Sequence, residues 1–139
     1  MEFDKCLCTG IRQAAQAMTE IYDRALAPSG LKITMFRLLR RLSDAGSPTI
    51  TELAELVELD RSSLSRNLKI LERDGLVYFK GSDDERSKVV QLTPAGKAAL
   101  KKALPLWLKV QARMKLEIGE EQDSILAIMS KINHARAAS

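Results

Sequence analysis

The stretch LDRSSLSRNLKILERDGLV, residues 59–77, combines an apolar face with a basic one. Leu64, Leu68 and Leu71 recur at spacings of four and three residues, which is typical of one face of a helix. The opposite face carries five hydroxyl or basic side chains, with no acid among them: Ser62, Ser65, Arg66, Lys69 and Arg73. Such groups suit a negatively charged partner, although any solvated amphipathic helix also has a polar outer face.

If that partner is duplex DNA, the first two turns of this helix would enter the major groove, which is ~12 Å wide. Arginine can donate two hydrogen bonds to guanine, serine can reach bases or phosphates, and lysine meets phosphate as a point charge. The side chains expected near bases are Ser62, Ser63, Ser65 and Arg66. Arg61 and Lys69 are expected near phosphates, whereas Arg73 lies too far along the helix and is expected to be solvated.

A second charged stretch, DDERSK, lies between the β-rich runs LVYFK (76–80) and KVVQL (88–92). Two such runs joined by a Gly- and Asp-containing turn predict a β-hairpin. Arg86 and Lys88 would stand near its tip, where an arginine suits a narrow, electronegative minor groove. A nearby carboxylate can hold a guanidinium in one rotamer, and we assign that role to Asp84. Taken alone, this turn is more typical of a solvated charged loop than of a DNA contact.

The elements that would position these residues form a mainly α fold with a small β-hairpin wing. Apolar spacing and breakers predict six helices, at residues 5–27, 34–44, 51–59, 61–74, 93–118 and 121–136. Asp60 is the expected N-cap of the helix at 61–74, Gly75 is its expected C′ residue, and Thr51 is expected to cap the short helix before it. Pro105 should kink the long helix.

The helices outside the middle of the chain carry long, nearly heptad-spaced apolar stripes. Nothing in the compact middle part is obviously left to cover them, so a second copy of the chain is the simplest partner. We therefore expect an N-terminal dimerisation helix at 1–30, a winged helix-turn-helix DNA-binding domain at 31–92 and C-terminal dimerisation helices at 93–139. The alternative is that the terminal helices pack only on each other.

Composition sets limits on the class of protein. The chain has 139 residues, of which 45% are hydrophobic and 29% charged, as in ordinary globular domains. No apolar run approaches the ~20 residues of a membrane span, and the N-terminus lacks a signal-peptide core, so a cytoplasmic location is expected. The net charge is +4, and residues 61–102 hold ten basic and five acidic side chains, which accounts for the surplus.

Catalytic chemistry has few candidate residues. Cys6, Cys8 and the single His134 cannot supply a four-ligand zinc site within one chain, and no metal site is expected. The sequence contains no Gly-rich phosphate loop and no spaced Ser/His/Asp set. We therefore expect neither an enzyme nor a resident cofactor.

The run TELAELVELDRSSLSRNLKILERDGLVYFKGSDDERSKVVQLTPAGK resembles the multiple-antibiotic-resistance regulator (MarR) family of bacterial repressors. The most specific pieces are DRSSLSR followed by N-L-K-x-L-E-x-x-G-L-V, the wing pattern D-x-R at Asp84 and Arg86, and L-T-P-A-G at 92–96. The resemblance implies a homodimer that binds a pseudo-palindromic operator in double-stranded DNA and represses transcription. It also implies release by a small aromatic or phenolic effector, although no polar cluster in the sequence identifies one.

The N-terminal thiols suggest a redox alternative. The chain is similar to the organic-hydroperoxide-sensing branch of the family in placing a cysteine near the start of its first helix and a tyrosine fourteen positions later, here Cys8 and Tyr22. This similarity implies a thiol-based redox-sensing repressor. It is incomplete, because Arg12 stands where that branch has a second tyrosine. The competing interpretation of Cys8 is a small, buried, inert residue. A third possibility for the chain is a winged-helix protein-interaction module that does not bind DNA.

Overall fold

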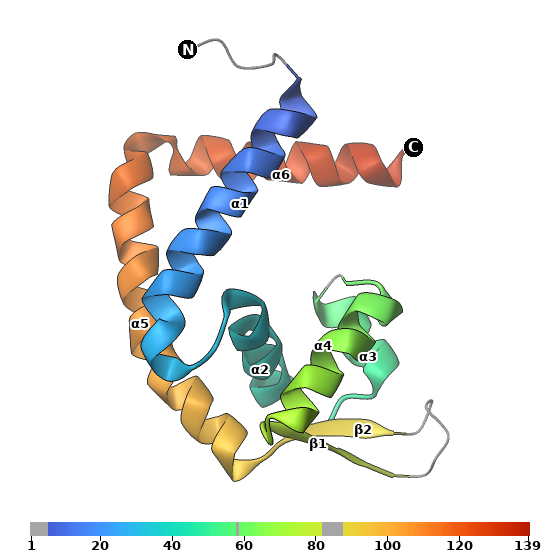
Figure 1. Cartoon of the computed structure of the whole chain (residues 1–139). Helices are drawn as coiled ribbons and strands as arrows, with labels where there is room; N and C mark the ends of the chain where they lie inside the picture. Colours follow the sequence, from blue (N-terminus) through green and yellow to red (C-terminus); the bar gives the residue numbers. More distant parts are fainter. Residues whose placement is uncertain (1–5, 58, 82–87) are drawn as a thin grey trace. The chain divides into compact units, whose positions relative to one another are not determined.

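The computed structural model describes residues 6–57, 59–81 and 88–139. The chain forms two compact units, Met1–Trp107 and Leu108–Ser139. The elements in chain order are α1 (Leu7–Leu26), the 3₁₀ turn η1 (Ala27–Ser29), α2 (Ile33–Ala45), α3 (Ile50–Val57), α4 (Arg61–Arg73), β1 (Val77–Lys80), β2 (Val89–Leu92), α5 (Pro94–Ile118), the 3₁₀ turn η2 (Gly119–Glu121) and α6 (Gln122–Ala137). The predicted mainly α fold with a hairpin wing is confirmed (Figure 1).

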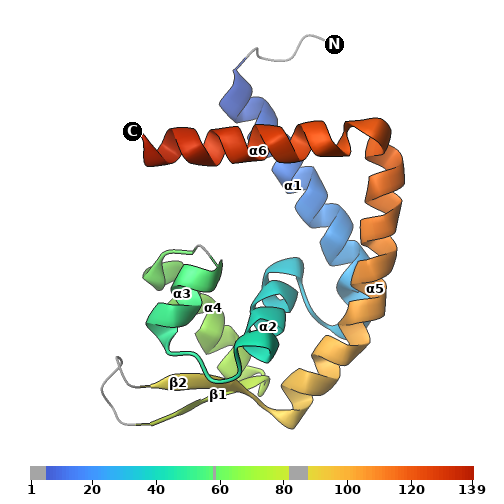
Figure 2. The ribbon, with the colours of Figure 1, turned by 180° about the vertical axis from the view of Figure 1, so that it is seen from behind.

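The core of the first unit lies between α2, α3, α4 and the hairpin (Figure 2). The leucine face of α4 is completely buried there, because Leu64, Leu68 and Leu71 are each 0% exposed. Phe36 of α2 and Val90 of β2 close the same cluster. Burying each of these side chains contributes roughly 1.5–3 kcal/mol, so the outward direction of the polar face of α4 is fixed by its apolar face.

Side-chain caps set the starts of the helices around α4. Asp60 is the N-cap of α4, as predicted, and Gly75 after the helix has a φ of +75°. The predicted cap of α3 was wrong: Thr49, not Thr51, accepts the N–H of Glu52 at 3.1 Å, and its hydroxyl donates back to Glu52 Oε1 at 3.0 Å. This reciprocal capping box starts α3 one residue before Thr51. At α2, Asp23 of α1 accepts the N–H of Ile33 at 2.7 Å.

The hairpin is antiparallel and forms backbone hydrogen bonds with the turn before α3. Tyr78 pairs with Gln91 and Val77 with Leu92, and the N–H of Val90 donates to the carbonyl of Pro48 at 2.9 Å. On leaving β2, Thr93 donates its N–H to Leu76 O at 3.1 Å, and α5 then starts against the same carbonyl. A Cβ on Gly96 would lie 2.0 Å from that oxygen, so the close approach of α5 to Leu76, the residue before β1, requires glycine at this position.

The terminal helices leave much of their apolar surface uncovered in the single chain. On α1, Leu7 is 81% exposed, whereas Tyr22 and Leu26 near its other end are buried. On α6 no residue is buried in the single chain, and the apolar side chains Ile125, Ile128, Met129 and Ile132 are each 38–51% exposed. The α5 helix continues through Pro105, so the kink expected there stays a prediction. No helix in the described ranges is long and apolar enough to cross a membrane.

Candidate nucleic-acid interface

The first turn of α4 is held by three linked polar side chains. Asp60 Oδ1 accepts the backbone N–H of Ser63 at 2.7 Å, and Asp60 Oδ2 accepts the Ser63 hydroxyl at 3.0 Å. The Ser63 oxygen in turn accepts Nη2 of Arg66 at 3.1 Å. The hydrogen bonds from Ser63 lower the pKa of the Asp60 carboxyl, so the ionised form is favoured. The start of the helix therefore couples its cap to the guanidinium of Arg66.

The outer face of α4 exposes the basic and hydroxyl groups predicted to meet DNA. Arg61, Ser62, Arg66 and Lys69 are exposed, and residues 61–71 contain no acid. Ser63 and Ser65 are half-buried at the edge of this face. The structure therefore brings the six predicted α4 residues onto the first two turns of one helix, with the leucine face turned inward. This arrangement presents positive charge and hydrogen-bond donors over a width that a major groove admits.

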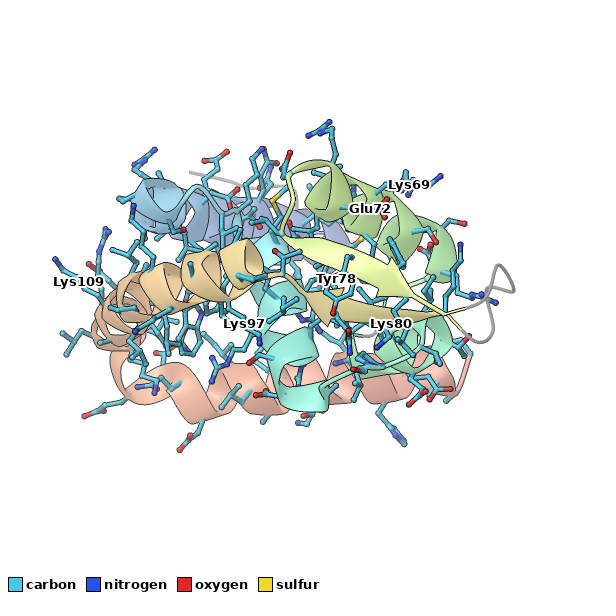
Figure 3. The ribbon with its side chains drawn as sticks, turned by 90° about the horizontal axis from the view of Figure 1, so that it is seen from below. Lys69, Glu72, Tyr78, Lys80, Lys97 and Lys109 are labelled. Carbon is cyan, nitrogen blue, oxygen red and sulfur yellow. The ribbon has the colours of Figure 1, made fainter. Side chains whose placement is uncertain are left out.

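A pocket of about 280 Å³ lies between α4 and the hairpin. Its polar lining comes from Ser65, Lys69 and Glu72 of α4 and from Lys88 beside β2. Figure 3 shows Lys69 and Glu72 on α4 next to the hairpin that carries Lys80. The two lysines outweigh the one glutamate in this lining, and the net positive charge suits an anionic oxygen, such as that of a phosphate.

Only one of the three residues predicted to act at the wing belongs to the part of the chain that the structure describes. Asp84 and Arg86 lie outside the described residues, whereas Lys88 is described and half-buried at the start of β2. Side-chain hydrogen bonds join the two strands of the hairpin to each other and to the turn before α3. The Tyr78 hydroxyl donates to Gln91 Oε1, and the Gln91 amide donates to the Ser47 hydroxyl. These contacts fix the base of the wing relative to the turn that precedes α3.

Arg73 belongs to a different environment from the basic residues of the first two turns. Its Nε lies 3.3 Å from Asp74 Oδ1 in an exposed ion pair at the end of α4. The pair partly neutralises the charge there, and an exposed pair of this kind contributes at most about 1 kcal/mol to stability. The geometry agrees with the expectation that Arg73 is a solvated charge.

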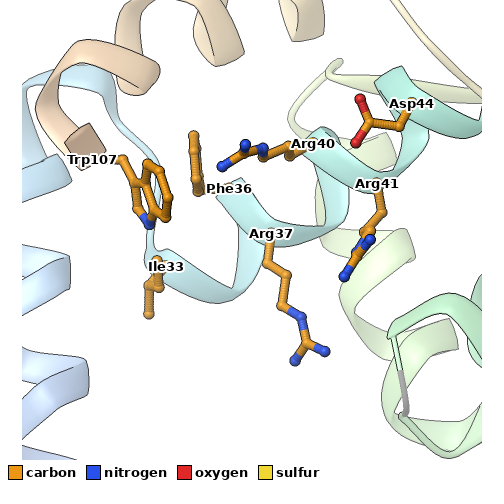
Figure 4. Close-up of a pocket in the computed structure, with 7 residues that line it drawn as sticks. All are labelled: Ile33, Phe36, Arg37, Arg40, Arg41, Asp44 and Trp107. Atoms are coloured by element: carbon orange, nitrogen blue, oxygen red, sulfur yellow. The ribbon is translucent and has the colours of Figure 1, made fainter. Parts of the chain in front are cut away.

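A second polar cluster was not predicted from the sequence. A pocket of about 360 Å³ is lined by the apolar Ile33, Phe36 and Trp107 and by the charged Arg37, Arg40, Arg41 and Asp44 (Figure 4). Trp107 stacks on Phe36 with ring centroids 5.8 Å apart, and the Arg40 guanidinium lies 4.7 Å over the Trp107 ring. No ion pair joins these three arginines to another described residue. The three cations next to an aromatic surface therefore favour an anionic, flat ligand.

The N-terminal thiols are both exposed in the single chain, whereas the inert interpretation of Cys8 expects it to be buried. Cys6 is the N-cap residue of α1, and hydrogen bonds from the backbone and side chain of Thr9 lower the pKa of its thiol. Tyr22 is buried at the other end of the same helix, and this burial raises the pKa of its hydroxyl. Cys8 and Tyr22 share one continuous helix and are ~21 Å apart along it, so they do not meet within the protomer.

Sequence reasoning missed three features that the structure contains. The link from Asp60 through Ser63 to Arg66 has a local signal, because the three residues are spaced by three positions. The arginines of the pocket also share one helix face. Trp107 is 67 positions beyond Arg40, however, and only the tertiary fold could place its ring beneath that guanidinium.

Comparisons with known proteins agree with this geometry. The model of the MarR family matches residues 31–88. A crystal structure of the M. tuberculosis transcriptional regulator MosR in complex with DNA has a TM-score of 0.85 and 39% identity, covering 96% of this chain and 98% of that chain. An uncharacterised HTH-type transcriptional regulator of Bacillus cereus is 32% identical over 105 residues, which is 74% of this chain and 70% of the relative. The organic hydroperoxide resistance transcriptional regulator of Bacillus subtilis is 28% identical over 107 residues, covering 76% of this chain and 73% of the relative.

Proposed function

Because the chain belongs to the MarR family of transcriptional regulators, we propose that it is a repressor that binds a pseudo-palindromic operator as a homodimer. The observation that carries the proposal is the outer face of the first two turns of α4, which contain no acid and expose Arg61, Ser62, Arg66 and Lys69 over a buried leucine face. Its place of action is the cytoplasm, where bacterial operators lie. MosR, at 39% identity, was crystallised with DNA, which supports the same partner here.

Each protomer docks α4 in a major groove and its wing in the adjacent minor groove. The α4 residues in contact with bases are Ser62, Ser65 and Arg66, and those near phosphates are Arg61 and Lys69. Lys88 adds a phosphate contact across the pocket that it shares with Lys69. Arg86 enters the minor groove with Asp84 holding its guanidinium. The two protomers repeat this arrangement on the two half-sites of the operator.

The homodimer forms through the terminal helices at 1–30 and 93–139. The support is their uncovered apolar surface, since α6 buries no residue in the single chain and Leu116 of α5 is 84% exposed. Exposed apolar groups on this scale mark a protein interface rather than a solvated surface. The predicted stripes on α1 and α6 supply the same kind of face, so two copies can cover each other.

We further propose that the effector which releases the operator is a small aromatic anion. The support is the pocket that Arg37, Arg40 and Arg41 line together with the Phe36 and Trp107 rings, with the Arg40 guanidinium over Trp107. An aromatic ring can stack in it, while a carboxylate or phenolate meets the guanidinium groups. Salicylate is a suitable probe: it should quench Trp107 fluorescence, and Arg40→Ala should weaken this effect more than the surface change Arg73→Ala does.

A second candidate mechanism of release is thiol oxidation. Its specific support is the exposed Cys6, whose pKa is lowered by hydrogen bonds from Thr9, together with the likeness to the hydroperoxide resistance regulator. A thiolate attacks the distal oxygen of an organic hydroperoxide, forms a sulfenic acid and releases the alcohol. Hydroperoxide should then weaken DNA binding by the wild type, and comparison of Cys6→Ser with Cys8→Ser would show which thiol reacts.

Salt dependence tests the proposed DNA binding directly. Three phosphate contacts in each protomer, from Arg61, Lys69 and Lys88, predict a slope of about −5 for log K against log salt in the dimer. Fluorescence anisotropy with a duplex enriched from a random pool measures this slope. Lys69→Gln should reduce its magnitude by about 2 per dimer. Binding without salt dependence would contradict the proposal and favour the protein-interaction module.

A further inference from the structure

The only proton of the Ser63 hydroxyl is already engaged in the protein without DNA. A serine hydroxyl has one donor proton and two acceptor lone pairs. Its proton is directed at Asp60 Oδ2 at 3.0 Å, and one lone pair receives Arg66 Nη2 at 3.1 Å. Ser63 therefore has no proton left for a phosphate or base acceptor unless the bond to Asp60 breaks.

We propose that Ser63 is a positioning residue that orients the Arg66 guanidinium for base contact and does not itself contact DNA. This inference rests on the proposed function, because it assigns a role within the same DNA-binding surface. It also replaces the expectation that Ser63 lies among the base contacts. Asp60 anchors the arrangement through its two carboxylate oxygens, one on the Ser63 backbone and one on the hydroxyl.

The geometry leaves Arg66 able to bind a base. Only one N–H of Nη2 is used by Ser63, so Nη1 and the second Nη2 proton remain free for guanine O6 and N7. A flexible arginine loses rotamer freedom when it binds, and a guanidinium already fixed at one nitrogen loses less. The negative charge of Asp60 also polarises the Ser63 hydroxyl, which makes its oxygen a better acceptor for Arg66.

The role can be separated from simple helix capping. Ser63→Ala removes both hydroxyl bonds but keeps the backbone N–H that donates to Asp60 Oδ1, so the cap of α4 remains. Ser63→Thr restores the hydroxyl. Asp60→Asn is a second way to break the link: asparagine is a good N-cap, but its amide would donate to the Ser63 oxygen and compete with Arg66.

The test is a double-mutant cycle in the full-length dimer. The probe is a duplex enriched by the wild type from a random pool, and the readout is the dissociation constant on this duplex and on its single-base variants. We expect Ser63→Ala to weaken binding about fivefold, with lost discrimination at the base pair where Arg66→Ala also loses it. In the Arg66→Ala background, Ser63→Ala should change binding less than about twofold, because nothing remains to be positioned.

Controls and contrary outcomes follow from the same cycle. Ser63→Thr should have a dissociation constant within about twofold of the wild type. Asp60→Asn should weaken binding as Ser63→Ala does. In these two weakened variants the slope of log K against log salt should not change. Ser62→Ala is the matched control, and its effect should be additive with that of Arg66→Ala. Equal effects of Ser63→Ala with and without Arg66, or lost discrimination at a different base pair, would overturn the positioning role while leaving the proposed function intact. A wild type that enriches no sequence would contradict the proposed function itself.

Discussion

Gly96 offers the sharpest test of how the wing is joined to α5. An alanine Cβ at this position would lie 2.0 Å from Leu76 O and 3.0 Å from its carbonyl carbon, where ordinary contacts begin at 3.4 Å. The oxygen cannot move freely, because it accepts the N–H of Thr93, the residue between β2 and α5, at 3.1 Å. Gly96→Ala must therefore displace backbone on one side of the contact.

Two opposing effects set the change in the free energy of unfolding that Gly96→Ala should cause. Overpacking typically costs about 1–3 kcal/mol, and the upper end is expected here because the displaced atom belongs to the backbone. The higher helix propensity of alanine offsets at most about 1 kcal/mol of this cost. We expect Gly96→Ala to lower the free energy of unfolding by about 2 kcal/mol, measured by urea denaturation at one fixed protomer concentration.

Gly10 provides the matched control for this experiment. It lies inside α1, its φ is not positive, and no heavy atom would lie within 4 Å of an added Cβ. Gly10→Ala should therefore keep stability or raise it by up to about 1 kcal/mol. If Gly96→Ala were as stable as the wild type, the close approach of α5 to Leu76 would not be a constraint on the fold.

Three further predictions concern single residues. Leu68→Ala should lower the free energy of unfolding by about 2–5 kcal/mol in urea, because the side chain is 0% exposed, and a loss below 1 kcal/mol would contradict its place in the core. Hydrogen bonds from Ser63 lower the pKa of Asp60 in the folded state. The stability that the ionised carboxylate contributes is therefore present above the unfolded pKa of about 3.9 and is lost as the pH falls through the folded pKa. Melting temperatures of Asp60→Asn measured against pH should lack this loss, and an unchanged decrease of melting temperature in acid would refute the assignment. Iodoacetamide should alkylate Cys6 faster than Cys8 at pH 7, since the lowered pKa increases the thiolate fraction, and equal rates by mass spectrometry would count against an activated Cys6.

Local signals in the sequence were sufficient for most of the fold. Asp60 and Gly75 mark the two ends of α4 because capping and positive φ depend on a few neighbouring residues. The same kind of signal was misjudged at α3, where the capping box runs from Thr49 to Glu52 and not from Thr51. The pairing of the two wing strands also followed from their β-rich composition and from the turn residues between them.

The site could be predicted only in part. The face of α4 follows from the leucine spacing, since the buried side of a helix fixes its opposite side. Whether a polar side chain is available for DNA or engaged with a neighbour depends on its rotamer, and Ser63 shows that spacing alone does not settle this point. The pocket formed by Arg40 and Trp107 depends on tertiary packing, which no local pattern encodes.

The central claim is that the first two turns of α4 determine which DNA sequence is bound. The most direct measurement compares Arg66→Ala with Arg73→Ala on the duplex that the wild type enriches, and on its single-base variants. Arg73 is the matched control, because it is an arginine on the same helix but is paired with Asp74. We predict that Arg66→Ala abolishes discrimination at one base pair in each half-site, while Arg73→Ala changes binding less than about twofold. Equal losses in both variants, or unchanged discrimination in Arg66→Ala, would contradict the account.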